Sequence, residues 1–237
     1  MKKILILAII GLFGLNGQSQ TMKQRVADRL YDELSFFKAV EMYQDLAKKD
    51  DATAYLLRRT AECHRFLGNS KESEVWYEKL VNSGLSEVVS EDYYQYAQML
   101  KMNEKYTLAN EMMTKFNSMS SDNSIASAHV SNSDYVKDLK SNPDRYNIAI
   151  LNKKVNTEDS DFGPNYLKVD GLTKITFASA RKNMAMLNKD FQWDGSHFLD
   201  VYVSKLGGDG ESTEVNRFDR GIKSKYHEGP VSFSNNG

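Results

Sequence analysis

The side chains that could support catalysis are few in this sequence, and their spacing matches no complete catalytic motif. Asp161-Phe-Gly163 is the tripeptide that holds magnesium in protein kinases, but the sequence has neither a glycine-rich phosphate loop nor a His-Arg-Asp catalytic loop. Gly207-Gly-Asp-Gly210 resembles part of a calcium-binding loop, yet it lacks the downstream glutamate ligand. We therefore expect a plain hairpin turn at Gly207–Gly210 and no phosphoryl-transfer chemistry.

The histidines and the cysteine also lack the spacing of a metal site or of an activated nucleophile. The four histidines lie far apart in the sequence, at His64, His129, His197 and His227. Cys63 is the single cysteine, which excludes an internal disulfide, and its helical surroundings predict a packed small residue. We expect no enzyme activity, no bound metal and no cofactor.

The first nineteen residues have the three parts of a secretory signal peptide. Lys2 and Lys3 form a basic start, residues 4–15 are almost entirely apolar, and Gly17 and Ser19 are small residues at a cleavage site. The apolar run is roughly a dozen residues, shorter than the ~20 that cross a bilayer as a helix. We expect a cleaved, soluble periplasmic protein, with a retained N-terminal anchor as the alternative. No cysteine lies near the cleavage site, so a lipoprotein is not expected.

The rest of the chain changes character near residue 120. The formal net charge is −1, which gives no indication of nucleic-acid or lipid binding. Up to Met119 the apolar residues recur with helical spacing, whereas from Tyr146 short β-branched and aromatic stretches alternate with turn residues. A short helix is expected in the linker, between Ser133 and Pro143. The predicted segments are a signal peptide (1–19), helical repeats (20–120), a linker (121–145) and a strand-rich region (146–237).

Small residues recur in the helical half at a spacing of 34 to 36 residues. One series is Ala27, Ala61 and Ala97, and a second is Ala39, Ser73 and Ala109. A period of 34 residues is that of the tetratricopeptide (TPR) repeat, which is a pair of antiparallel helices. Small residues let such helices pack closely, so we predict six helices from Met22 to Met119. Tight turns are predicted at residues 33–35, 67–69 and 102–104, and a generic helical bundle is the alternative.

The repeat phase places one set of polar and aromatic side chains on the concave face of a TPR stack. The first helix of each repeat lines that face, which binds partner proteins without chemistry of its own. We expect this face to bind an envelope protein, and the alternative is that these are ordinary solvated helix residues. The residues are Gln24, Asp28, Tyr31, Arg58, Glu62, Arg65, Tyr94, Gln98 and Lys101.

A nine-residue motif occurs twice in the strand-rich half. Gly163–Gly171 and Gly229–Gly237 both begin with Gly-Pro and end with Asp-Gly or Asn-Gly, 66 residues apart. Each copy is typical of a short strand followed by a turn. Residues 181–197 are expected to form an inserted loop. Further strands are predicted at Tyr146–Leu151, Leu172–Ser179, Leu199–Lys205 and Glu214–Phe218.

These motifs resemble the WD40-like (PD40) β-propeller of OmpA-family envelope proteins of Bacteroidota. The similarity rests on residues 161–164, 175–179 with Arg181, 200–202 and 227–237. In that family a signal peptide and TPR repeats precede the propeller, and an OmpA-like domain that binds peptidoglycan usually follows. The resemblance implies an α+β multidomain protein, in which a TPR-like solenoid is followed by the first blade of a propeller.

A propeller needs at least four blades, so we expect this sequence to be an N-terminal fragment without the peptidoglycan-binding domain. The expected function is a non-catalytic periplasmic scaffold, associated with the outer membrane, that binds proteins through its TPR and propeller surfaces. Two alternatives stay open. One is a component of the type IX secretion machinery, which is usually a lipoprotein. The other is a periplasmic propeller hydrolase or sugar-binding enzyme whose site lies in other blades.

Overall fold

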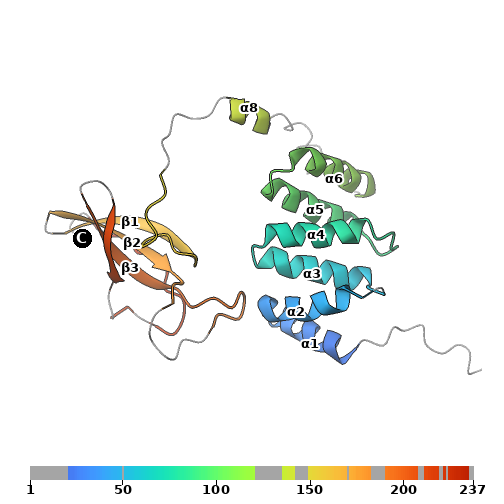
Figure 1. Cartoon of the computed structure of the whole chain (residues 1–237), viewed down its shortest axis with the longest axis horizontal. Helices are drawn as coiled ribbons and strands as arrows, with labels where there is room; N and C mark the ends of the chain where they lie inside the picture. Colours follow the sequence, from blue (N-terminus) through green and yellow to red (C-terminus); the bar gives the residue numbers. More distant parts are fainter. Residues whose placement is uncertain are drawn as a thin grey trace, which may run out of the picture. The chain divides into compact units, whose positions relative to one another are not determined.

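The protein is α+β, with a helical TPR-like region followed in the sequence by a small antiparallel sheet (Figure 1). The structure is a computed structural model, and it describes residues 21–49, 51–120, 135–141, 149–169, 171–182, 190–207, 211–218, 221–222 and 224–234. The predicted signal peptide, residues 1–19, lies outside the described residues. Among the helices described, none has the length and apolar character needed to span a membrane.

The chain divides into two compact units, one ending at Lys105 and one beginning at Tyr106. Within the described part of the first unit, five helices stack in sequence order, and each packs against the next (Figure 1). They are α1 (Met22–Asp32), α2 (Phe36–Ala47), α3 (Ala54–Phe66), α4 (Ser70–Val81) and α5 (Ser90–Met102). The second unit begins with α6 (Tyr106–Met119), which is followed by a short helix, α8 (Tyr135–Ser141). α8 lies where the sequence predicts a linker helix, although Ser133 lies outside the described residues.

Close packing at the small residues is confirmed. All six members of the two series have no exposed surface: Ala27, Ala39, Ala61, Ser73, Ala97 and Ala109. The Ser73 hydroxyl donates a hydrogen bond of 2.9 Å to the backbone carbonyl of Ala61. The side chain of α4 therefore contacts the backbone of α3 directly at this point. A larger side chain at such a crossing would force the helices apart.

The first helix of each repeat ends in the same turn. One residue in each turn has a left-handed backbone: φ is 58° at Leu34, 74° at Gly68 and 61° at Glu104. In each turn the next amide closes a Schellman motif by bonding a carbonyl of the last helical turn. These bonds are Ser35 N to Leu30 O, Asn69 N to His64 O, and Lys105 N to Leu100 O, at 2.8–2.9 Å. The three predicted turns are therefore confirmed, and their left-handed residues recur at the spacing of the repeat.

The left-handed turn predicts a stabilising substitution at Leu34. Glycine tolerates this backbone conformation better than a branched residue does, and the Leu34 side chain is 52% exposed and contributes little burial. Leu34→Gly should raise the free energy of unfolding by about 0.5–1 kcal/mol, measured by urea denaturation. The reciprocal variant, Gly68→Ala, should lower it by about 1 kcal/mol, because an added Cβ meets nothing within 4 Å and only the backbone is strained. A lower stability of Leu34→Gly would contradict this account of the turn.

Cys63 has the packing role that the sequence predicts. Its side chain is fully buried in α3, and burial raises the pKa of its thiol to about 12. The thiol therefore stays protonated at neutral pH, and a protonated thiol is a poor nucleophile.

His64 is buried in the same helix without full hydrogen bonding. Its Nε2 lies 2.8 Å from the side-chain nitrogen of Gln44, while its Nδ1 has no hydrogen-bond partner among the described residues. Burial lowers the pKa of His64, and the charge of Glu72 only partly opposes this effect. The neutral imidazole is thus the form that fits the folded helix stack.

His64 makes the helical unit sensitive to acid. An unfolded histidine titrates near pH 6.5, so the unfolded state binds the extra proton first as the pH falls. The stabilising contribution is complete above that pH, and we expect it to be lost as the pH falls from about 7 towards 5. His64→Gln should reduce the loss of melting temperature between pH 7.5 and 5.5, followed by circular dichroism at 222 nm. His227→Gln, which replaces an exposed histidine of the second unit, is the control. Equal losses in His64→Gln and the unsubstituted protein would exclude His64 as the cause.

The sheet of the second unit contains four antiparallel strands in sequence order. They are β1 (Asp161–Val169), β2 (Leu172–Ser179), β3 (Asp200–Leu206) and β4 (Ser212–Arg217). β2 has the predicted bounds, and β3 and β4 lie within two residues of theirs. A hairpin joins β3 to β4 as predicted, with Gly207 N bonded to Glu211 O at 2.8 Å, although residues 208–210 lie outside the described ones.

Two strand predictions are wrong for the residues that the structure describes. Residues 149–151 of the predicted strand Tyr146–Leu151 form none, because this segment leads into a loop whose carbonyls bond a side chain. The second motif copy, described to Ser234, is not a strand either. Instead it returns to β1. Asn165 Nδ2 donates to the Val231 carbonyl at 3.1 Å, and a Cβ at Gly163 would overlap the ring of Pro230.

Arg181 joins the loop before β1 to the sheet. Its guanidinium donates to the carbonyls of Lys154 and Val155 at 2.8 Å and to Asp161 at 2.9 Å. It also lies 4.8–5.0 Å from the centres of the Phe177 and Tyr202 rings, which form a small core with Val155. Burial alone would raise the pKa of Asp161, but hydrogen bonds from side chains that include Thr157 and Arg181 lower it. Asp161 of the Asp-Phe-Gly tripeptide therefore has a structural role here.

Loss of Arg181 should loosen the sheet selectively. Arg181→Gln leaves two carbonyls without their donor and removes the cation from the buried Asp161 carboxylate, which should cost roughly 3–5 kcal/mol in the sheet. We expect faster hydrogen exchange at the β1 and β2 amides, with the exchange of α1 to α5 unchanged. Lys182→Gln removes a neighbouring exposed charge and serves as the control. Unchanged exchange in Arg181→Gln would show that the sheet does not depend on this contact.

Candidate functional site

The nine residues predicted to face a partner occupy three equivalent positions on α1, α3 and α5. We call this surface the first-helix face. All nine side chains are partly buried, so each is accessible but supported by its neighbours. In repeat order the positions are Gln24, Arg58 and Tyr94; Asp28, Glu62 and Gln98; and Tyr31, Arg65 and Lys101.

At the α1–α3 step, the acidic residues of the face are already bonded within the protein. The Tyr31 hydroxyl donates to Glu62 at 3.0 Å, and Arg59 forms an ion pair with Glu62 at 2.9 Å. Asp28 accepts hydrogen bonds from the hydroxyls of Tyr43 and Tyr55, at 2.6 and 2.7 Å. These contacts join α1, α2 and α3, and they give both carboxylates hydrogen-bond partners within the protein.

At the α3–α5 step, Arg58 is a structural residue and not an available cation. Its Nε and Nη2 bond both carboxylate oxygens of Asp92 at 2.7 and 2.8 Å, and Nη2 also donates to the Glu87 carbonyl. Asp92 is buried and also accepts from the Val89 amide at the start of α5. Asp92, the partner of Arg58, is not among the predicted site residues. The signal that could have found it is an acidic residue in the first turn of α5, one repeat after Arg58.

Two cations of the face, Arg65 and Lys101, have no such partner. Neither forms an ion pair with a carboxylate in the described part of the chain. The Arg65 guanidinium lies 4.3 Å from the centre of the Phe66 ring, and it opposes the rise in the pKa of Tyr77 that burial causes. Its Nε is buried without a hydrogen-bond acceptor among the described residues. Burial lowers the pKa of Lys101.

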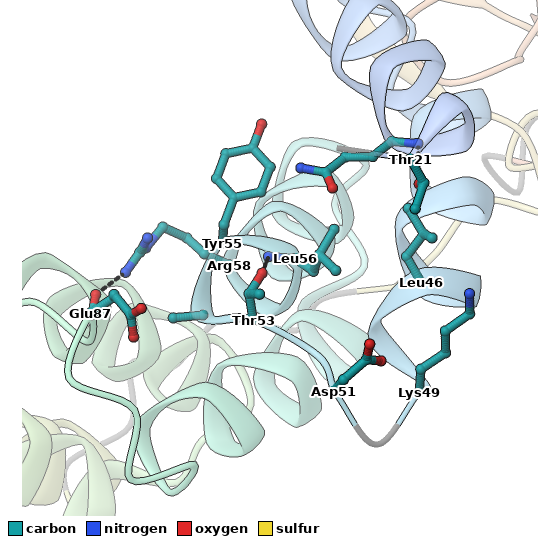
Figure 2. Close-up of a pocket in the computed structure, with 11 residues that line it drawn as sticks. Thr21, Leu46, Lys49, Asp51, Thr53, Tyr55, Leu56, Arg58 and Glu87 are labelled. Carbon is teal, nitrogen blue, oxygen red and sulfur yellow. Dashed lines mark hydrogen bonds between the residues drawn. The ribbon is translucent and has the colours of Figure 1, made fainter. Parts of the chain in front are cut away.

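A pocket of about 570 Å³ opens beside the face, where α1 and α3 begin. Figure 2 shows Thr53 at the start of α3, where its hydroxyl accepts a hydrogen bond of 3.3 Å from the Leu56 amide. It also shows the Arg58 side chain bonded to the backbone carbonyl of Glu87. Gln24 and Tyr55 also line the pocket. The pocket contains charges of both signs, from Lys49 and Asp51 as well, so it favours no single class of small ligand.

The site offers binding contacts and no recognisable reacting groups. Over the described ranges, no three His, Cys, Asp or Glu side chains are placed together to hold a metal ion. The absence of enzyme activity and of a cofactor stays a prediction from the sequence.

Comparisons with known proteins give partial structural likenesses. The chain matches no protein-family model, and no curated protein matches it. One similar solved structure is the C-terminal part of a TPR repeat-containing protein from Cytophaga hutchinsonii, with 19% sequence identity and a TM-score of 0.42. The match covers 48% of this chain and 44% of that chain, so less than half of that structure is represented here. The features that make the helical region TPR-like are its helix pairs, its buried small residues and its recurring turns.

Proposed function

We propose that this protein is a non-catalytic scaffold that binds a partner protein on the first-helix face. The observation that supports the proposal is the continuity of that face: equivalent positions on three successive first helices carry partly buried polar and aromatic side chains. Such a repeated surface suits an extended partner, which can contact each repeat in turn. The pocket beside α1 and α3 adds a recess into which a side chain of the partner could fit.

The proposed setting is the periplasm, in association with the outer membrane. The support comes from the signal-peptide pattern of residues 1–19 and from the resemblance to OmpA-family envelope proteins. In that setting peptidoglycan would be bound by a separate OmpA-like domain and not by the residues described here. A role in type IX secretion is the alternative for the same scaffold.

We further propose that the sheet is a blade of a WD40-like propeller. Four antiparallel strands in sequence order are the architecture of one blade. The second motif copy contacts the first at an equivalent residue, since the Asn165 side chain bonds the backbone of Val231, 66 residues later. Contacts of this kind are expected between successive blades of a ring. The loops of a propeller would give the scaffold a second binding surface.

Site-specific crosslinking tests the binding face. A photoreactive amino acid in place of Gln98, on the first-helix face, should give a protein adduct of defined mass when producing cells of a Bacteroidota species are irradiated. The same substitution at Glu78, an exposed residue of α4, is the matched control and should give none. Equal labelling at the two positions, or no adduct at Gln98, would contradict the proposal.

A further inference from the structure

We propose that the first-helix face binds an acidic segment of its partner, whose carboxylates contact Arg65 and Lys101. This inference rests on the proposed function and adds the chemistry of the partner. It places the contact at the α3–α5 end of the face and not in the pocket beside α1.

Most charges on the first-helix face are paired within the protein. Arg58 is neutralised by Asp92, and Glu62 by Arg59. Asp28 is held by two phenol hydroxyls at the α1 end of the face, away from α5. At the α3–α5 step, Arg65 and Lys101 are therefore the cations of the face that form no ion pair among the described residues.

The two cations occupy equivalent positions along the repeat, as an extended ligand that contacts successive repeats requires. Arg65 and Lys101 are equivalent residues of neighbouring repeats, in the last turns of α3 and α5. The bidentate contact of Arg58 with Asp92 holds these two helices side by side. Gln98 lies one turn before Lys101 and adds an amide that can bond a carboxylate or a peptide backbone.

Partial burial distinguishes these two cations from the exposed charges of the helix surface. The buried Arg65 Nε has lost water without gaining an acceptor within the described structure. Burial also disfavours the charged form of Lys101. A carboxylate of the partner would contact the accessible part of the Arg65 guanidinium, and such contacts are charge-assisted hydrogen bonds.

A role at the helix ends is the competing explanation, because cations stabilise the last turn of a helix. Arg29 and Lys79 occupy the last turns of α1 and α4 and are exposed. The helix-end effect applies to all four cations, but it does not explain why Arg65 and Lys101 are partly buried without carboxylate partners. Arg29 and Lys79 are therefore matched controls.

The test uses the full chain and a labelled unstructured peptide with glutamates alternating with serines, measured by fluorescence anisotropy. The glutamate peptide should bind, and the same peptide with glutamines should not. Arg65→Gln with Lys101→Gln should weaken binding by at least about tenfold, as expected for the loss of charge-assisted hydrogen bonds. Arg29→Gln with Lys79→Gln should change it by less than about twofold.

Further measurements keep the outcomes distinct. The melting temperature of the Arg65/Lys101 variant should be unchanged or higher, since a helix-end role would lower it. If that double variant does not fold, Lys101→Gln alone and Arg65→Lys replace it, and each should still weaken binding. Equal binding of the glutamine peptide would overturn the inference, and so would tripolyphosphate that binds more tightly than the glutamate peptide. An adduct at Gln98 that forms equally well in the double variant would support the scaffold proposal and contradict the binding of an acidic segment.

Discussion

The close approach of helices at six small residues is the constraint on which the rest of the helical architecture depends. At Ala27, Ala61 and Ala97 a side chain no larger than a methyl group occupies each crossing, and each is fully buried. This spacing sets the angle and distance between successive helices, and it therefore decides which residues of α1, α3 and α5 are left partly exposed. The first-helix face depends on this packing, because the repeat that buries the alanines also places the polar residues at equivalent positions on α1, α3 and α5.

In both units a partly buried arginine connects two segments of the chain. Arg58 joins α3 to α5 through Asp92, and Arg181 joins a loop to β1 through Asp161 and two carbonyls. In each case the carboxylate is satisfied by additional donors, which a buried charge requires if its desolvation is to be offset. Arg65 differs, because its guanidinium lies 4.3 Å from the centre of the Phe66 ring and forms no ion pair among the described residues.

The sequence was sufficient where the signal is local. Helices, Schellman turns and the position of Cys63 follow from apolar spacing and small residues within one repeat, and β2 follows from a continuous β-branched and aromatic stretch. Features that depend on a distant partner were harder. The repeat phase predicts Arg58 in the binding set. Its bond to Asp92 depends on the register between α3 and α5, which the sequence does not show. The strand predicted before β1 fails over its described residues because a strand needs a neighbour, and Arg181 takes the carbonyls of the following loop instead.

The contact between Asn165 and Val231 has a consequence for how such a protein can change in length. It joins a side chain to the backbone of the equivalent position 66 residues further along, so one side of the contact donates and the other accepts. A head-to-tail joint of this kind is directional. In the proposed propeller, insertion or deletion of one whole blade would recreate the same contact between new neighbours, whereas removal of half a blade would leave the asparagine without its carbonyl acceptor. Such a propeller would therefore change in length by whole blades.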